Sequence, residues 1–472
     1  MVTRPRRGPP LLRVAGWLVG PPAILLAAWF AINATDEELS PQARGAIQVA
    51  PPPAPSETNG YLDYLALGAV EGAPTYQVAL SRLRELNDPS RVKNPFPLAE
   101  VKLDERIPSC LPWHQSCLNE AAALPHLQAL IDGHSVFLRR YRTMREKPQF
   151  IELLDSSSPH DDRPSYRTLF EGSRLSRLVA AIKINAGDVT AAIDELEIDN
   201  SFHRRLGAGT RGLIQKMVFY ALLDQDAVFI AEIARKIPSA AQAHWRRLEG
   251  LVRVPAKNEV EIVPGLKHEF AMNMAWMQTR SNVRLPDSHY ELAKNFPDRI
   301  SERPLWDPVL PYLYRPHYSL NVNARRASIV LVLAALPSTE FFKGKEAAEK
   351  QLDALEPGLV KGLALSPAGY RHDLLEVFYF DYIARMHTTS GVQTLVRLLV
   401  NLKAAGITKH EDVVAALAGP LGRAHPDPFT GGPMRFDPKT ETVGFDTQLE
   451  VKLFSGAVRG LVERYGRMAL PL

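Results

Sequence analysis

The sequence contains very little cysteine, only Cys110 and Cys117 among 472 residues. Thiols tend to be oxidised outside the cytoplasm, and the pair lies close together in SCLPWHQSCL, so we predict a disulfide between them. Two other interpretations stay open. A metal site with His114 needs a fourth ligand and reduced thiolates, and a redox-active pair would depart from the C-x-x-C spacing of thioredoxin-like proteins.

An excess of one charge is also lacking, because the formal net charge is only +4. Four arginines lie before residue 14, so the rest of the chain is close to neutral. It therefore has no basic footprint of the kind that binds nucleic acid, and we expect no nucleic-acid partner. The hydrophobic fraction of 46% and the charged fraction of 23% are typical of a folded globular protein.

Familiar catalytic motifs are absent as well. The sequence has no H-E-x-x-H, no G-x-S-x-G, no phosphate-binding G-x-x-x-x-G-K and no dinucleotide fingerprint. Ser90 and Lys93 match S-x-x-K, a pattern expected about once by chance in a chain of this length. These absences count against the common enzyme classes, and we predict no cofactor and no metal.

One long hydrophobic run is present, Val14–Ile32, and it contains no charged residue. As a helix it spans about 28 Å, close to the hydrocarbon thickness of a bilayer. Arginines precede the run and acidic residues follow it, which places the N-terminus in the cytoplasm and the body outside it. A cleaved signal peptide is the alternative, but bulky Ile32 stands where cleavage after Ala34 needs a small residue. The flanking charges are Arg4, Arg6, Arg7, Arg13, Asp36, Glu37 and Glu38.

The fold class predicted is mainly α, with an N-terminal transmembrane helix, an irregular array of helical hairpins and a small β-hairpin near the C-terminus. The body (59–421) contains a candidate hinge near 255–264. The other parts expected are a basic cytoplasmic tail (1–13), the transmembrane helix (14–32), a Pro-rich spacer (33–58) and the C-terminal β-hairpin with its tail (422–472).

The clearest pattern in the body is a helical hairpin. Apolar residues form one stripe in 175–184, Gly187 and Asp188 supply a stop and a cap, and a second stripe runs through 191–196. No fixed period is sustained over three units, so we expect an irregular array rather than a repeat protein. The segment 118–146 is predicted to be one long helical segment whose arginines lie on a solvated face.

The C-terminal part of the sequence is rich in residues that favour turns. Asp427 opens a turn before proline, and the glycine pair at Gly431 allows positive φ. The short alternating runs Met434–Phe436 and Val443–Phe445 are predicted to pair as a β-hairpin.

Few side chains qualify for acid/base chemistry. His268 and Glu269 are adjacent on a mostly apolar helix, and His372 and Glu376 lie one turn apart on another. Ion pairing with an arginine is the simpler interpretation of the first glutamate. The second pair lacks the further ligands that a metal needs, and the polar loop 160–162 is interpreted as solvated.

Three segments carry a resemblance: NGYLDYLALGA near Asn59, the cysteine pair followed by FLRRYRTM, and DPFTGGPMRFDPKTETVGF near the C-terminus. In this order they resemble uncharacterised single-anchor proteins of Gram-negative bacteria. The resemblance implies an inner-membrane protein that faces the periplasm. It implies no activity, so it assigns no catalytic residue.

Two functions fit these observations. The first is an interaction or scaffold module of the cell envelope, anchored in the membrane by its N-terminal helix and binding an envelope protein or peptide. The second is an envelope hydrolase with carboxylate acid/base residues, for which His268, Glu269, His372 and Glu376 are the candidates. We favour the first, because the anchor, the spacer and the helical hairpins support it and no catalytic constellation is found.

Overall fold

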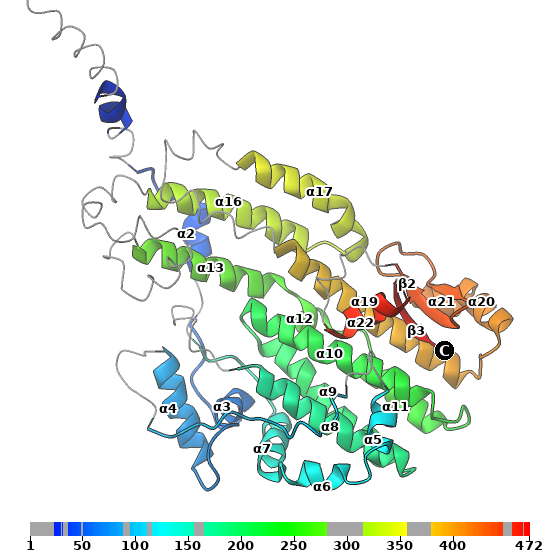
Figure 1. Ribbon diagram of the computed structural model, residues 1–472. Helices are drawn as coiled ribbons and strands as arrows, with labels where there is room; N and C mark the ends of the chain where they lie inside the picture. The colour runs from blue at the N-terminus through cyan, green and yellow to red at the C-terminus, as the bar shows by residue number, and fades with distance from the viewer. Residues whose placement is uncertain are drawn as a thin grey trace, which may run out of the picture. The chain divides into compact units, whose positions relative to one another are not determined.

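The computed structural model describes residues 23–29, 31, 36–48, 51–87, 95–110, 116–154, 165–280, 315–355, 379–446, 456–465 and 467–472. The chain is mainly helical, as predicted, and has a small antiparallel sheet near the C-terminus (Figure 1). The helices are α2 (Pro41–Ile47), α3 (Gly60–Leu65), α4 (Thr75–Asn87), α5 (Cys117–Ala122), α6 (Leu127–Asp132), α7 (Ser135–Glu146), α8 (Arg167–Asn185), α9 (Val189–Gly209), α10 (Leu213–Ala234), α11 (Gln242–Leu251), α12 (Lys257–Val260), α13 (Val263–Arg280), α16 (Pro316–Ala334), α17 (Ser338–Leu355), α19 (Tyr379–Ala404), α20 (His410–Ala418), α21 (Pro420–Ala424) and α22 (Gly456–Tyr465).

The chain forms two compact units. The smaller one combines Met1–Gln48, Phe270–Ile329 and Ala348–Val377, and the larger one combines Val49–Glu269, Val330–Ala347 and Phe378–Leu472. Residues 255–264, the candidate hinge, belong to the larger unit, and one boundary of that unit follows Glu269.

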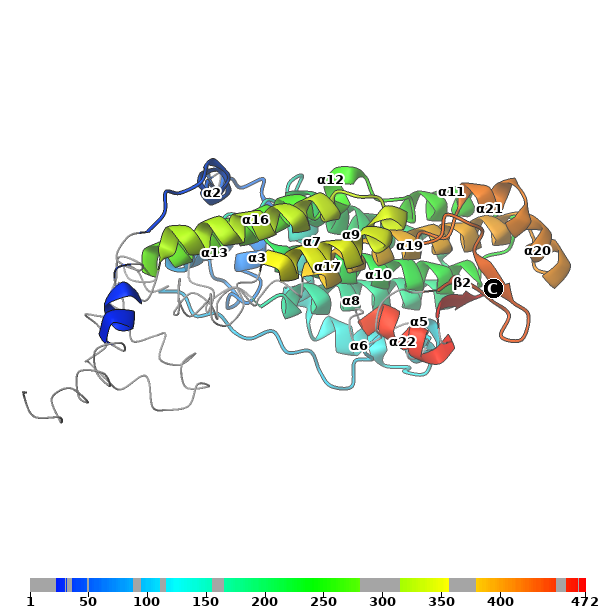
Figure 2. The same cartoon turned by 90° about the horizontal axis from the view of Figure 1, so that it is seen from above.

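The predicted helical hairpin is confirmed as α8 and α9. Gly187 has φ +84°, a left-handed conformation that glycine adopts without strain, and it ends α8. The side chain of Asp188 then accepts a hydrogen bond from the Ala191 N–H and caps α9. α10 packs against α9 and against α19, so α8, α9 and α10 lie side by side in the larger unit (Figure 2).

The single helical segment predicted for 118–146 is wrong, because three helices occupy it. Pro125 lies between α5 and α6, and Gly133 ends α6 before α7 begins. The solvated face predicted for the arginines is also wrong in part: Arg139 and Arg142 are exposed, whereas Arg145 is only 2% exposed.

The C-terminal β-hairpin is confirmed, and the sheet has one strand more than predicted. β1 (Arg435–Asp437) pairs antiparallel with β2 (Thr442–Phe445), with Phe436 opposite Val443. β2 also pairs antiparallel with β3 (Met468–Pro471), which lies in the segment predicted to be a tail. β2 is therefore the central strand, and all its residues are buried.

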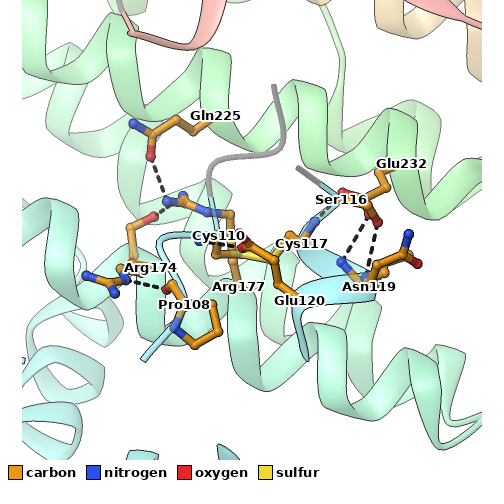
Figure 3. Close-up of a disulfide and its surroundings, with 12 residues drawn as sticks. Pro108, Cys110, Ser116, Cys117, Asn119, Glu120, Arg174, Arg177, Gln225 and Glu232 are labelled. Atoms are coloured by element: carbon orange, nitrogen blue, oxygen red, sulfur yellow. Dashed lines mark hydrogen bonds between the residues drawn. A yellow bond between two sulfur atoms is a disulfide. The ribbon is translucent and has the colours of Figure 1, made fainter. Parts of the chain in front are cut away.

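The disulfide between Cys110 and Cys117 is present, with the Cα atoms 4.5 Å apart. It joins the loop before α5 to the first residue of α5, beside the buried carboxylate of Glu232 on α10 (Figure 3). That carboxylate accepts hydrogen bonds from the backbone N–H of Cys117 at 3.2 Å and of Leu118 at 3.0 Å. An anion here satisfies the free N–H groups of the first turn and holds α5 against α10.

The N-terminal region departs from the predicted spacer. Within 33–58, residues 41–47 form α2, and Asp36 accepts hydrogen bonds from the backbone N–H of His317 at 2.6 Å and of Tyr318 at 3.1 Å. The carboxylate therefore caps the start of α16, so this part of the predicted Pro-rich spacer contains a helix and contacts α16. Residues 51–56 have no regular secondary structure.

Of the predicted transmembrane run Val14–Ile32, residues 14–22, 30 and 32 lie outside the described part of the chain. Among the described residues, no helix is long and apolar enough to cross a membrane. Residues 23–29 are helical, and three of their large apolar side chains are exposed, with Ile24 and Leu25 each 70% and Leu26 56% accessible.

Candidate functional site

A cluster of six charged or titratable side chains is buried in the larger unit. On α9, Glu195, Asp199 and His203 follow one another at i, i+4 spacing, so they share one face of the helix. That face points inward, toward polar residues of α7, α8 and α10. The six side chains are each at most 7% exposed: Arg145, Arg177, Glu195, Asp199, His203 and Asp226.

Arg145 forms one half of the cluster. Its guanidinium donates to Glu195 and lies 3.3 Å from Asp199 Oδ1. Asp199 also accepts a hydrogen bond from the Tyr141 hydroxyl at 2.9 Å and from the Ser173 hydroxyl at 3.1 Å. Because burial removes water from the ring and Asp199 lies next to it, the pKa of Tyr141 is raised well above its usual value, so Tyr141 is the donor of this bond.

Arg177 and His203 form the other half. Arg177 donates to Ser173 Oγ at 2.7 Å and to Gln225 Oε1 at 2.6 Å, and its Nη1 lies 3.6 Å from Asp226 Oδ1. His203 Nδ1 lies 2.7 Å from Asp226 Oδ2. Burial lowers the pKa of His203, but the attraction of Asp226 and Asp199 outweighs burial, and the pKa is raised above 6.5. Protonated His203 brings the cluster to three cations and three carboxylates.

Three of these residues have the composition of a metal site. Atoms of Asp199, His203 and Asp226 that are able to bind a metal all lie within 4.8 Å of one another. However, Arg145 and Arg177 lie 3.3 and 3.6 Å from the two carboxylates and already supply the positive charge. A divalent ion would have to be accommodated beside two guanidinium groups, which is unfavourable. The donor set therefore fits an ionic network that supports the core rather than a metal centre.

An arginine-lined pocket of about 510 Å³ opens beside this network. It lies between α9, α11 and the segment that contains α12, entirely within the larger unit. Its lining has five arginines and only two acidic residues. The lining residues are Glu197, Asn200, Ser201, Arg204, Arg205, Ala208, Arg246, Arg247, Gly250, Leu251, Arg253, Asn258 and Glu259.

Three of the pocket arginines are held by carboxylates. Arg247 pairs with Asp194 at 2.5 Å and with Glu197 at 2.7 Å, and these hydrogen bonds raise its pKa. Arg204 and Arg253 both pair with Glu259, at 3.0 and 2.5 Å. These guanidinium groups are fixed in place, as a preformed binding surface requires.

The other two pocket arginines, Arg205 and Arg246, have no carboxylate partner among the described residues. Arg205 donates one hydrogen bond to the backbone oxygen of Arg145, but its buried Nε has no hydrogen-bond partner. Burial lowers the pKa of Arg205. Arg246 is exposed. The pocket thus keeps two positive charges that no carboxylate in the described part of the chain neutralises.

Asn200 connects the pocket to the buried network. Its side-chain N–H donates to Asp226 at 3.2 Å, and its side-chain oxygen accepts from Arg204 Nε at 2.9 Å. Arg204 also donates to the backbone oxygens of Leu251 and Arg253 at 2.9 and 3.0 Å. The wall of the pocket is therefore continuous with the core of the hairpin.

Of the acid/base candidates predicted from sequence, the structure describes only His268 and Glu269. His268 and Glu269 lie on α13, and neither lines the pocket. His372, Glu376, His114, the loop 160–162 and the segment 90–93 lie outside the described residues.

Neither the buried network nor the pocket was predicted from the sequence. The available signal was the spacing of Glu195, Asp199 and His203, which places three titratable groups on one face of a helix that also carries Ile193 and Leu196. The pocket had no such signal, because its arginines come from separate elements.

Comparison with protein families, curated proteins and solved structures finds no match to this chain.

Proposed function

We propose that the chain is a membrane-anchored helical binding module of the bacterial cell envelope, and that the arginine-lined pocket binds an anionic ligand. The observation that carries the proposal is the lining of the pocket, five arginines against two glutamates. Guanidinium groups donate paired hydrogen bonds to carboxylates and phosphates. A concave site with an excess of them also concentrates anions through its electric field.

Binding is favoured over catalysis by the chemistry of the same lining. Both glutamates are paired with arginines, so neither is placed as a general base. The lining contains no histidine, cysteine or lysine, and its only hydroxyl belongs to exposed Ser201. This set of side chains can hold and orient an anion, but it supplies no activated nucleophile.

The membrane anchor rests on separate support. Positive charges precede the apolar run and negative charges follow it, and the helical residues 23–29 expose large apolar side chains that lipid would cover. The disulfide agrees with a location outside the cytoplasm, where disulfides persist.

The proposal is tested on the full chain reconstituted in nanodiscs of phosphatidylcholine. Isothermal titration with phosphate and with succinate is compared with titration with uncharged glycerol at matched ionic strength. We expect Arg246→Glu to weaken binding of the anions about tenfold or more, since it reverses a charge that no carboxylate pairs with. Arg142→Glu changes an exposed arginine outside the pocket and is the control. Equal effects of the two variants, or no binding of any anion, would overturn the proposal.

A further inference from the structure

The charges of the pocket restrict the class of anion that it can bind. Glu197 and Glu259 of the lining, together with Asp194 outside it, pair with three arginines, Arg204, Arg247 and Arg253. These six groups neutralise one another. What remains is the pair of arginines without a carboxylate, and a ligand that completes the balance carries two negative charges.

Resting on the proposed function, we infer that the pocket binds a phosphate monoester, with Arg205 of α9 and Arg246 of α11 as the residues that hold its phosphate group. A phosphate monoester carries a charge of about −1.5 to −2 at neutral pH and has three terminal oxygens that accept strong hydrogen bonds. Two guanidinium groups from different helices provide the matching charge and number of donors.

Other donors in the pocket fit the same group. Ser201 and Asn258 line the pocket and add a hydroxyl and an amide donor. A tetrahedral group uses donors that arrive from several directions, whereas a carboxylate uses donors in one plane.

The size of the pocket leaves room for the esterified part of the ligand. A volume of about 510 Å³ lies in the range of sites that take whole small molecules. The space beside Gly250, which lines the pocket, is open, because a Cβ added there would meet no atom within 4 Å. The ester is either a soluble phosphate or the headgroup of a lipid such as phosphatidic acid, and both present the same phosphate chemistry to the arginines.

The inference is tested by titrating the full chain in phosphatidylcholine nanodiscs with three probes. These are glycerol 3-phosphate, succinate as a dianion without phosphate, and dihexanoyl phosphatidic acid as a soluble lipid headgroup. At about pH 7.5, where the phosphate is doubly ionised, we expect glycerol 3-phosphate to bind about tenfold or more tightly than succinate. Tighter binding of dihexanoyl phosphatidic acid than of glycerol 3-phosphate identifies a lipid ligand, and equal binding identifies a soluble one.

Two variants test whether the ligand binds in the pocket. The double variant Arg205→Gln with Arg246→Gln removes both free charges and should abolish binding of glycerol 3-phosphate. Because Arg205 also donates to the backbone of Arg145, Gly250→Leu provides a second variant, which fills the pocket from an open position. We expect Gly250→Leu to abolish binding and Gly250→Ala and Arg142→Gln to retain it.

The outcomes separate this inference from the proposed function. Succinate binding as tightly as glycerol 3-phosphate, with both lost in Arg246→Glu, would overturn the phosphate ligand and keep the anion site. Binding of glycerol 3-phosphate that survives Gly250→Leu would also overturn the inference, because the ligand would then lie elsewhere. No binding of any probe would overturn both.

Discussion

At the scale of single residues, the positive and negative charges of the buried cluster are equal only when His203 is protonated. Its pKa is raised in the folded protein above the ordinary value of 6.5. Protonation therefore stabilises the folded state: the contribution is complete below about pH 6.5 and is lost as the pH rises through the folded pKa. We expect the free energy of unfolding to fall by about 1.4 kcal/mol for each unit by which the pKa is raised.

Urea unfolding between about pH 6 and pH 8 measures this effect, and His203→Gln is expected to remove the decline. Lys216 affects the stability of the protein in a different pH range. Burial lowers its pKa from 10.5 to about 8, so its contribution to stability rises from about pH 8 upward. An identical decline in His203→Gln and in the unchanged protein would show that His203 is not the titrating group.

Two arginines of α7 provide a matched comparison. Arg145→Met removes the nearest cation of the buried carboxylates of Glu195 and Asp199 and leaves them only the more distant Lys183 and His203, at 3.8 and 3.7 Å. We expect a loss of about 3 kcal/mol in the free energy of unfolding. Arg142→Met alters an exposed side chain and should change it by less than about 0.5 kcal/mol. Thermal and urea unfolding decide the matter, and similar losses in both variants would contradict a special role for Arg145.

Arg142 and Arg145 also show what could not be predicted from the sequence. Apolar periodicity correctly buries Phe137, Leu138 and Tyr141 of α7, and it places every arginine among the exposed positions. Arg145 is buried because its acidic partners lie on α9, about 50 residues away along the chain. A pattern within one helix contains no information about a partner on another helix.

At the scale of elements, the space around each helical glycine shows how closely the neighbouring helix packs. A Cβ at Gly172 of α8 would lie 2.2 Å from the Tyr141 ring of α7, whereas a Cβ at Gly250 of α11 meets nothing within 4 Å. We expect Gly172→Ala to destabilise the protein by about 1 to 3 kcal/mol through overpacking. Gly250→Ala should stabilise it by up to about 1 kcal/mol, because alanine favours a helix. Chemical unfolding measures both, and a stabilising Gly172→Ala would contradict the close contact of α7 with α8.

Elements were predictable where one local signal defines them. The turn between α8 and α9 was found because Gly187 and Asp188 carry the stop and the cap next to each other. The strand β3 was missed, since four residues, MALP, give no alternating pattern and become a strand only by pairing with β2 more than twenty residues earlier. The candidate pocket was missed for a related reason: its arginines come from α9, from α11 and from the loop after α11, and they come together only in the folded unit.

At the scale of the whole molecule, topology decides which compartment supplies the ligand. We expect a periplasm-active reporter fused after Leu472 to be active, and mass spectrometry to find the N-terminal arginines retained, because the charge asymmetry around Val14–Ile32 predicts that the body lies across the membrane. Changing Arg4, Arg6, Arg7 and Arg13 to glutamate removes this asymmetry and should abolish reporter activity, whereas the same change at exposed Arg139 and Arg142 should not. A mature N-terminus near Thr35 would make the protein a released one. An inactive reporter in the unchanged chain would overturn the orientation and remove the reason to expect the disulfide to be oxidised in the cell.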